Sequence, residues 1–147
     1  DGANIIANHT DFSHATLIKA DLSGSTCTNA NFSDANLHYS NLQGAHLAHA
    51  RFQNAKLREA NLEGATLLES NLCGADLSQS SLINANLAHA DFLETTLVQT
   101  NLQGSSLEQV SHLTEKQLSK AKTLLNTKMD QILFASMKKS YSELFKS

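Results

Sequence analysis

The sequence predicts an all-β solenoid in which the backbone turns a corner every five residues around a narrow apolar interior. Large apolar residues recur at every fifth position, small residues recur two positions earlier, and glycines recur at a spacing of twenty. A five-residue period matches neither the 3.6-residue turn of a helix nor the two-residue alternation of an ordinary strand. We therefore expect an N-terminal cap over residues 1–9, a β-helix over 10–110 and an α-helical cap over 111–147.

The N-terminal nine residues fit the repeat less well than the residues that follow. Ala3-Asn4-Ile5 has the order of a repeat unit but is out of phase with the later units by two residues. A unit shifted in this way predicts a distorted first corner, so we interpret residues 1–9 as a cap.

The central hundred residues keep the five-residue repeat without a gap. Positions 12 to 107, taken in steps of five, hold fifteen Leu, four Phe and one Cys, while positions 10 to 105 hold twelve Ala, five Ser and three Thr. The residue between them is mostly polar, as in Ala35-Asn36-Leu37. We expect the large side chain to point inward and the small one to occupy the remaining room. The predicted core includes Phe12, Phe32, Phe52, Phe92, Leu37, Leu57 and Leu77.

This array resembles the pentapeptide repeat family, whose consensus is A(D/N)LXX, over residues 10–109. The resemblance implies a right-handed quadrilateral β-helix with four units and twenty residues per turn. One hundred residues would then form about five four-sided coils. With about 4.8 Å between neighbouring coils, such a rod would be about 24 Å long.

Two sets of residues give independent support for a twenty-residue turn. The four phenylalanines of the array are separated by multiples of twenty, so they would stack on one side. Gly24, Gly44, Gly64 and Gly104 are also spaced in twenties, with Asn84 in the missing place, and Gly74 alone departs from this column. Each follows a central leucine by two residues, where a type II turn requires positive φ. We therefore expect type II corners on one edge of the solenoid.

The C-terminal 37 residues change to a helical pattern. Thr114 and Gln117 have the spacing of a capping box, and Leu118, Ala121 and Leu125 follow at helical spacing. Asp130 is a second candidate N-cap, for a helix that runs to about Phe145. Two such helices would seal the open end of the solenoid against edge-to-edge pairing. The tail also resembles that of bacterial, especially cyanobacterial, members of the family, and it would act as a cap alone or as a cap and a dimer contact.

Charge is divided between the two parts of the chain. Residues 1–110 contain eleven acids and four bases, a net charge of −7, whereas residues 111–147 carry seven lysines against three acids, a net charge of +4. An acidic body does not attract nucleic acid phosphates, so we expect no direct nucleic acid binding. The apolar runs are only a few residues long, so we expect no membrane span.

One ladder of side chains has residue types that bind metals. It would stand on successive coils and consists of Asn29, His49, Glu69, His89 and Gln109, with His46 nearby. Two imidazoles beside a carboxylate could bind a transition metal or move a proton. A convex surface offers neither a second shell nor a cavity that excludes water, so a solvated ladder is the favoured interpretation.

The two cysteines give no indication of a metal site, a disulfide or a catalytic thiol. Cys27 and Cys73 lie far apart and lack the spacing of a zinc site or a disulfide framework. Cys27 takes a core position, and Cys73 has no neighbouring Lys or Arg in the sequence to activate it. We expect no catalytic residues, no metal site and no cofactor.

These observations predict a non-enzymatic structural or protein-interaction module that presents its outer faces to a protein partner, as a monomer or as a dimer through the C-terminal helices. The family resemblance implies an alternative, because some members mimic the width and charge of DNA and bind type II topoisomerases such as gyrase. The cytoplasm is the default location, and a lumenal, periplasmic or secreted location stays open.

Overall fold

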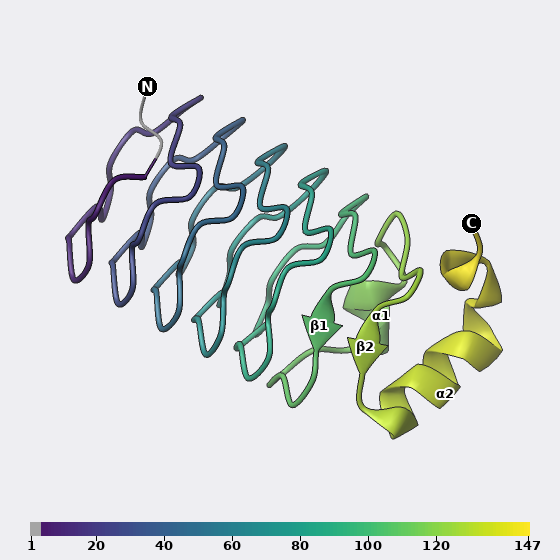
Figure 1. The fold of residues 1–147 in the computed structure, drawn as a ribbon. Coiled ribbons are helices and arrows are strands. Elements are labelled where there is room, and N and C mark those ends of the chain that lie inside the picture. Colours follow the sequence, from purple (N-terminus) through teal and green to yellow (C-terminus); the bar gives the residue numbers. More distant parts are fainter. Residues whose placement is uncertain (1–3) are drawn as a thin grey trace.

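The computed structural model describes residues 4–147, which wind as a β-solenoid with helices at the C-terminal end (Figure 1). Parallel bridges join residues that are twenty apart, from Ile6 with Thr26 to Asp91 with Ser111. Each coil contributes four bridge positions, five residues apart, so the four repeat units of a coil form its four sides.

Every corner of the regular coils is a tight turn. At a typical corner the Ala35 N–H donates to the Phe32 carbonyl at 3.1 Å, and Asp34 has a φ of 58°. The corners of the glycine column have the positive φ expected there, and positive φ also recurs every five residues on the other three edges. Left-handed backbone costs a non-glycine residue about 1–2 kcal/mol, and a closed core with paired backbone groups outweighs that cost at corners such as His14 and Lys19.

Where the residue before the central apolar residue is Asn or Asp, its side chain stabilises the corner that follows. Asn61 Oδ1 accepts the Glu63 N–H at 3.1 Å, and Asp76 Oδ1 accepts the Ser78 N–H at 2.9 Å. Asn and Asp side chains form such bonds to the backbone two residues later more readily than most others. The Asn or Asp of the repeat is therefore a structural residue that satisfies a backbone donor at the corner.

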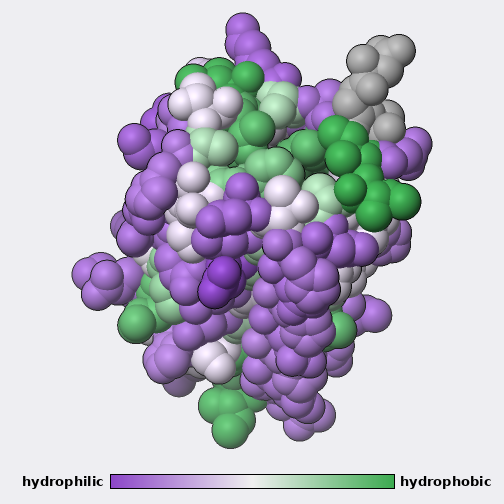
Figure 2. All heavy atoms as spheres, turned by 90° about the vertical axis from the view of Figure 1, so that its left-hand side faces the viewer, coloured by the Kyte–Doolittle hydropathy of each residue, from purple (hydrophilic) through white to green (hydrophobic). Residues whose placement is uncertain are grey.

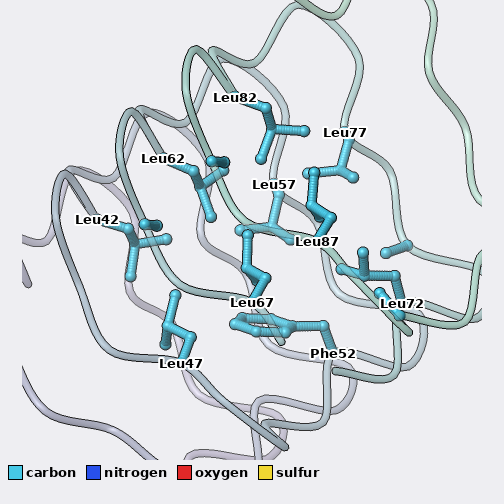
Figure 3. Packing of buried hydrophobic residues seen from close by; sticks show 14 of the residues in the cluster. Leu42, Leu47, Phe52, Leu57, Leu62, Leu67, Leu72, Leu77, Leu82 and Leu87 are labelled. Carbon is cyan, nitrogen blue, oxygen red and sulfur yellow. The ribbon is translucent and has the colours of Figure 1, made fainter. Parts of the chain in front are cut away.

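The interior is filled by the central residues of the units. In Figure 3, leucines from successive sides of the coils and Phe52 point into the same space. Leu37, Leu57 and Leu77 are at most 1% exposed. Burying each such side chain contributes about 1.5–3 kcal/mol.

The phenylalanines lie on one side of this interior. The rings of Phe12, Phe32 and Phe52 stack with centroids 4.9 and 5.0 Å apart, which matches the separation of adjacent coils. Leu72 occupies the next place in the column, and Phe92 follows it. Phe32, Phe52 and Phe92 are fully buried, whereas Phe12, in the first full coil, is half-buried.

Residues 5–9 continue the regular coil, so a separate, out-of-phase cap is wrong for them. Ala7 is inward and 7% exposed, and its N–H donates to the Thr26 carbonyl at 2.8 Å. Ala3, on which the shifted register was based, lies outside the described residues. Figure 2 views this end, where hydrophobic atoms gather among hydrophilic ones, and exposed apolar residues include Ile5, Ile6 and Ile18.

The solenoid also continues past residue 110, with one irregular coil. Strand β1 (Ser106–Leu107) pairs in parallel with β2 (Lys128–Met129), an offset of 22 residues rather than twenty. Helix α1 (Glu115–Leu118) lies within this coil, so the first helix is shorter than expected. The chain leaves the helix because Leu124 returns to a fully buried inward position.

The C-terminal end carries α2 (Gln131–Ser140) and a 3₁₀ helix, η1 (Ser142–Phe145). Met137 of α2 is fully buried, and the Leu124 N–H donates to the Leu144 carbonyl at 2.6 Å, so this segment covers the last coil. Asp130 precedes α2 but makes no side-chain capping bond to it, and its carboxylate accepts the Gln109 N–H at 3.4 Å instead. Within residues 4–147, no helix is both long enough and apolar enough to cross a membrane.

Candidate functional site

The closed interior leaves the outer walls and the irregular C-terminal coil as candidate sites. The ladder singled out in the sequence lies on one edge, where Asn29, His49, Glu69, His89 and Gln109 are all positive-φ corner residues. His49 Nδ1 lies 3.4 Å from Glu69 Oε2, and both side chains are about half exposed. His46 lies on a flat side, in the bridge ladder with Thr26 and Thr66.

These residues do not form a metal centre in the described chain. Among residues 4–147, no three His, Cys, Asp or Glu side chains are grouped closely enough to hold an ion. The geometry is that of an exposed imidazole–carboxylate contact, which contributes little in high-dielectric surroundings.

The acidic residues of the body are separated from one another along the coils. Apart from Asp21, which has Asp1 twenty positions earlier in the sequence, each one in residues 4–110 is flanked by non-acidic residues at the positions twenty away. Asp21 faces Asn41, whose amide donates to its carboxylate at 3.1 Å. Asp76 lies opposite Lys56 in a parallel backbone β-bridge. This alternation avoids like charges on adjacent coils and interrupts every column of negative charge.

A cluster of Cys73, Asp91 and His112 forms where the regular coils end. His112 Nδ1 lies 2.7 Å from Asp91 Oδ1, and the same carboxylate oxygen accepts the Leu93 N–H at 3.1 Å. Burial opposes ionisation of Asp91, but the hydrogen bonds from His112, Leu93 and Cys73 hold its pKa below the usual value. The ladder spacing of twenty did not reveal this cluster, because Cys73 and Asp91 are 18 positions apart and Asp91 and His112 are 21 apart.

This cluster does not activate the thiol. Burial, and then the hydrogen bond to the Asp91 carboxylate, raise the pKa of Cys73, so the nucleophilic thiolate is disfavoured. Burial likewise raises the pKa of the Cys27 thiol inside the core. The Asp91–His112 contact instead ties the start of the irregular coil to the last regular one.

The irregular coil opens a groove of about 530 Å³ that sequence reasoning missed. One wall is the segment 93–98 of the last regular coil, and the other contains Lys116 and Gln117 of α1 and Lys120 after it. The available signal was the interruption of the five-residue repeat, since position 112 holds His rather than an apolar residue, and the next fully buried leucine after Leu107 is Leu118.

Comparisons with known proteins agree with this architecture. The family model for pentapeptide repeats matches eight copies, over residues 10–47, 30–67, 40–79 and 70–109. A search of the curated proteins found no match.

Several solved structures are similar to this chain, and two of those described next, with TM-scores above 0.5, share its fold. The pentapeptide repeat protein alr5209 from Nostoc Pcc 7120 is 24% identical, with a TM-score of 0.59 and 86% of each chain covered. Full-length QnrB1, a plasmid-mediated fluoroquinolone resistance protein, is 15% identical, with a TM-score of 0.54 and coverage of 93% of this chain and 87% of its own. A thylakoid-lumen pentapeptide repeat protein from Arabidopsis thaliana is 29% identical, with a TM-score of 0.49 and coverage of 79% and 72%.

Proposed function

The chain belongs to the pentapeptide repeat family, and from this premise we propose that it is a non-enzymatic module that presents the outer faces of a solenoid to a protein partner. The observation that carries the proposal is the filled interior, where the central side chains of the units from residue 22 to 107 are at most 5% exposed. Such a core leaves no internal cavity for a substrate, so recognition falls to the walls and to the grooves beside the irregular coil.

The physical form of these walls supports protein recognition. Corner side chains recur at the spacing of the coils, on a backbone whose hydrogen bonds are satisfied between neighbouring coils. A rigid surface of this kind loses little conformational entropy on binding, which favours affinity for another folded surface.

The test combines partner capture with surface variants. The immobilised chain would be used to isolate partners from its native cells, and each partner would then be purified and titrated against the chain by calorimetry. We expect Arg51→Glu, at a position that lies between Asn31 and Asn71 on the adjacent coils, to weaken binding while leaving the melting temperature unchanged. Turnover of a substrate that is lost on His49→Ala or Glu69→Ala would contradict a non-enzymatic role.

A second candidate function is binding of a type II topoisomerase as a mimic of DNA. The net charge of −7 on residues 1–110 and the rod shape favour it, whereas the interrupted columns of acidic residues oppose it. A supercoiling assay with purified gyrase tests this function at low salt, where electrostatic attraction is strongest. Absence of inhibition at micromolar protein would eliminate it.

The C-terminal helices could also join two copies. Ile132 of α2 is 88% exposed beside Val110 and Leu113, so an apolar face remains after α2 has covered the last coil. Sedimentation equilibrium of the chain and of Ile132→Asp would decide between a cap alone and a cap with a dimer contact. A dimer that Ile132→Asp dissociates would support the second role.

A further inference from the structure

The groove beside α1 is a place where the ladder of backbone hydrogen bonds is interrupted. In the preceding coil the N–H groups of Gly74 and Leu77 donate to the carbonyls of Leu93 and Thr96, at 2.8 and 3.0 Å. The equivalent donors one coil later are the N–H groups of Glu94 and Leu97. Neither donates to any protein acceptor in the part of the chain that the structure describes.

The acceptors on the same edge are already occupied. Gln117 Nε2 donates to the Thr95 carbonyl at 3.0 Å, in place of the backbone N–H that a regular coil would supply, as Thr96 does for Ala75. It also donates at 2.8 Å to the Phe92 carbonyl, which already accepts the corner bond from the Thr95 N–H. Leu97 itself is only 1% exposed, so an N–H without an acceptor there is costly. The groove therefore offers donors and calls for a ligand with acceptor oxygens.

The rest of the groove defines the chemistry of that ligand further. Leu93 and Val98 are 46% and 44% exposed, so one wall presents aliphatic surface. Lys116 and Lys120 line the opposite wall. Glu94, on the same wall as Leu93 and Val98, is the acidic residue among those that line the groove. The two lysines belong to residues 111–147, which carry a net charge of +4, and they make this wall of the groove locally positive. They favour a negatively charged ligand that also carries apolar side chains.

We propose that this groove binds an extended acidic peptide segment of a partner protein. Carbonyl oxygens of the peptide accept the N–H groups of Glu94 and Leu97, as the carbonyls of a regular coil would. Aliphatic side chains of the peptide pack on Leu93 and Val98, and its carboxylates lie beside Lys116 and Lys120. The inference rests on the proposed function, because it names one site within the protein-binding surface.

The test uses the full chain labelled with ¹⁵N and a short capped peptide in which aspartate alternates with leucine and valine. We expect this peptide to slow hydrogen exchange of the Glu94 and Leu97 amides several-fold and to shift their resonances. The amides of Gly74 and Leu77 are the internal control, because they already donate to the next coil. A matched peptide with lysine in place of aspartate should leave all four amides unchanged.

Charge reversal provides the second arm of the test. Lys116→Glu with Lys120→Glu should weaken binding of the acidic peptide about tenfold or more, and raising the salt concentration should weaken binding to the unsubstituted chain. Lys138→Glu with Lys139→Glu on α2 is the matched control, since these lysines lie outside the groove. The control variant should bind like the unsubstituted chain.

Three results would overturn the proposal: no protection at millimolar acidic peptide, equal binding of the lysine peptide, or protection of the two amides by a second, unlabelled copy of the chain. Failure here is distinguishable from failure of the proposed function. If a native partner binds the Lys116→Glu, Lys120→Glu variant with unchanged affinity, the chain is still a protein-binding module, but the groove is not its binding site.

Discussion

Alanine in place of Leu67 tests whether the core column stabilises the solenoid as the structure indicates. Leu67 is 1% exposed and sits between Leu47 and Leu87 in the same inward column. Its neighbour Leu68 points outward and is half-buried. The same substitution at the two adjacent positions therefore isolates the effect of side-chain direction.

The structure predicts different losses in the free energy of unfolding for the two variants. Leu67→Ala removes a buried side chain and leaves a cavity between coils that are held by their backbone ladders, so the free energy of unfolding should fall by about 3 kcal/mol. Leu68→Ala loses only part of its contact with the protein, and the expected decrease is below about 1 kcal/mol. For a chain of this size, 3 kcal/mol corresponds to a decrease in melting temperature of roughly 6–12 °C.

Urea unfolding followed by circular dichroism measures both values. The unsubstituted chain, Leu67→Ala and Leu68→Ala should give similar slopes if unfolding stays cooperative, and a smaller slope for Leu67→Ala would show that the two halves of the rod separate. Equal destabilisation by the two substitutions would refute the assignment of inward and outward positions.

Three further predictions concern corners and the irregular coil. Gly44 has a φ of 65°, and no neighbouring atom lies within 4 Å of the position that a Cβ would take, so Gly44→Ala should cost only about 1–2 kcal/mol and Gly44→Asn less, as measured by thermal unfolding. Hydrogen bonds from the Ser23 side chain and N–H hold the pKa of Asp21 below its ordinary value, so its stabilising effect is complete above the unfolded-state pKa of about 3.9 and is lost as the pH falls through the lower folded-state pKa. Asp21→Asn should therefore flatten the acid-unfolding curve, and an unchanged curve would contradict this assignment. Gln117→Ala should cost about 1–2 kcal/mol and speed hydrogen exchange in α1, because it removes the capping box and both bonds to the last regular coil.

The regular part of the fold could be predicted because a single spacing determines it. The central residues, the small residues before them and the glycine column follow one period, and a closed solenoid is the arrangement that buries them all. The extent of positive φ could not be predicted from glycine alone. Residues such as Tyr39 and Glu59 adopt it because the ladder and the core on both sides of each corner fix the backbone there.

The irregular coil shows where local pattern was misleading. Leu118, Ala121 and Leu125 have helical spacing, and Leu118 and Ala121 are buried as this spacing predicts. Leu124 rather than Leu125 packs into the core, however, and the backbone of Thr123 pairs with Asn101. Pairing satisfies backbone groups of both this segment and the sheet edge at residues 100–104, whereas a longer helix would satisfy only its own. The groove arises from that competition, since two extra residues and α1 push one side of the coil outward.

The constant offset of twenty residues has a consequence for how such a chain can change its length. Inserting one whole coil would lengthen the rod and leave every downstream side chain on its original wall. Inserting a single five-residue unit would instead rotate everything beyond it by a quarter of a turn, moving each later column to a neighbouring wall. Growth by complete turns is therefore the route that preserves a recognition surface, whereas growth by quarter turns creates a new one.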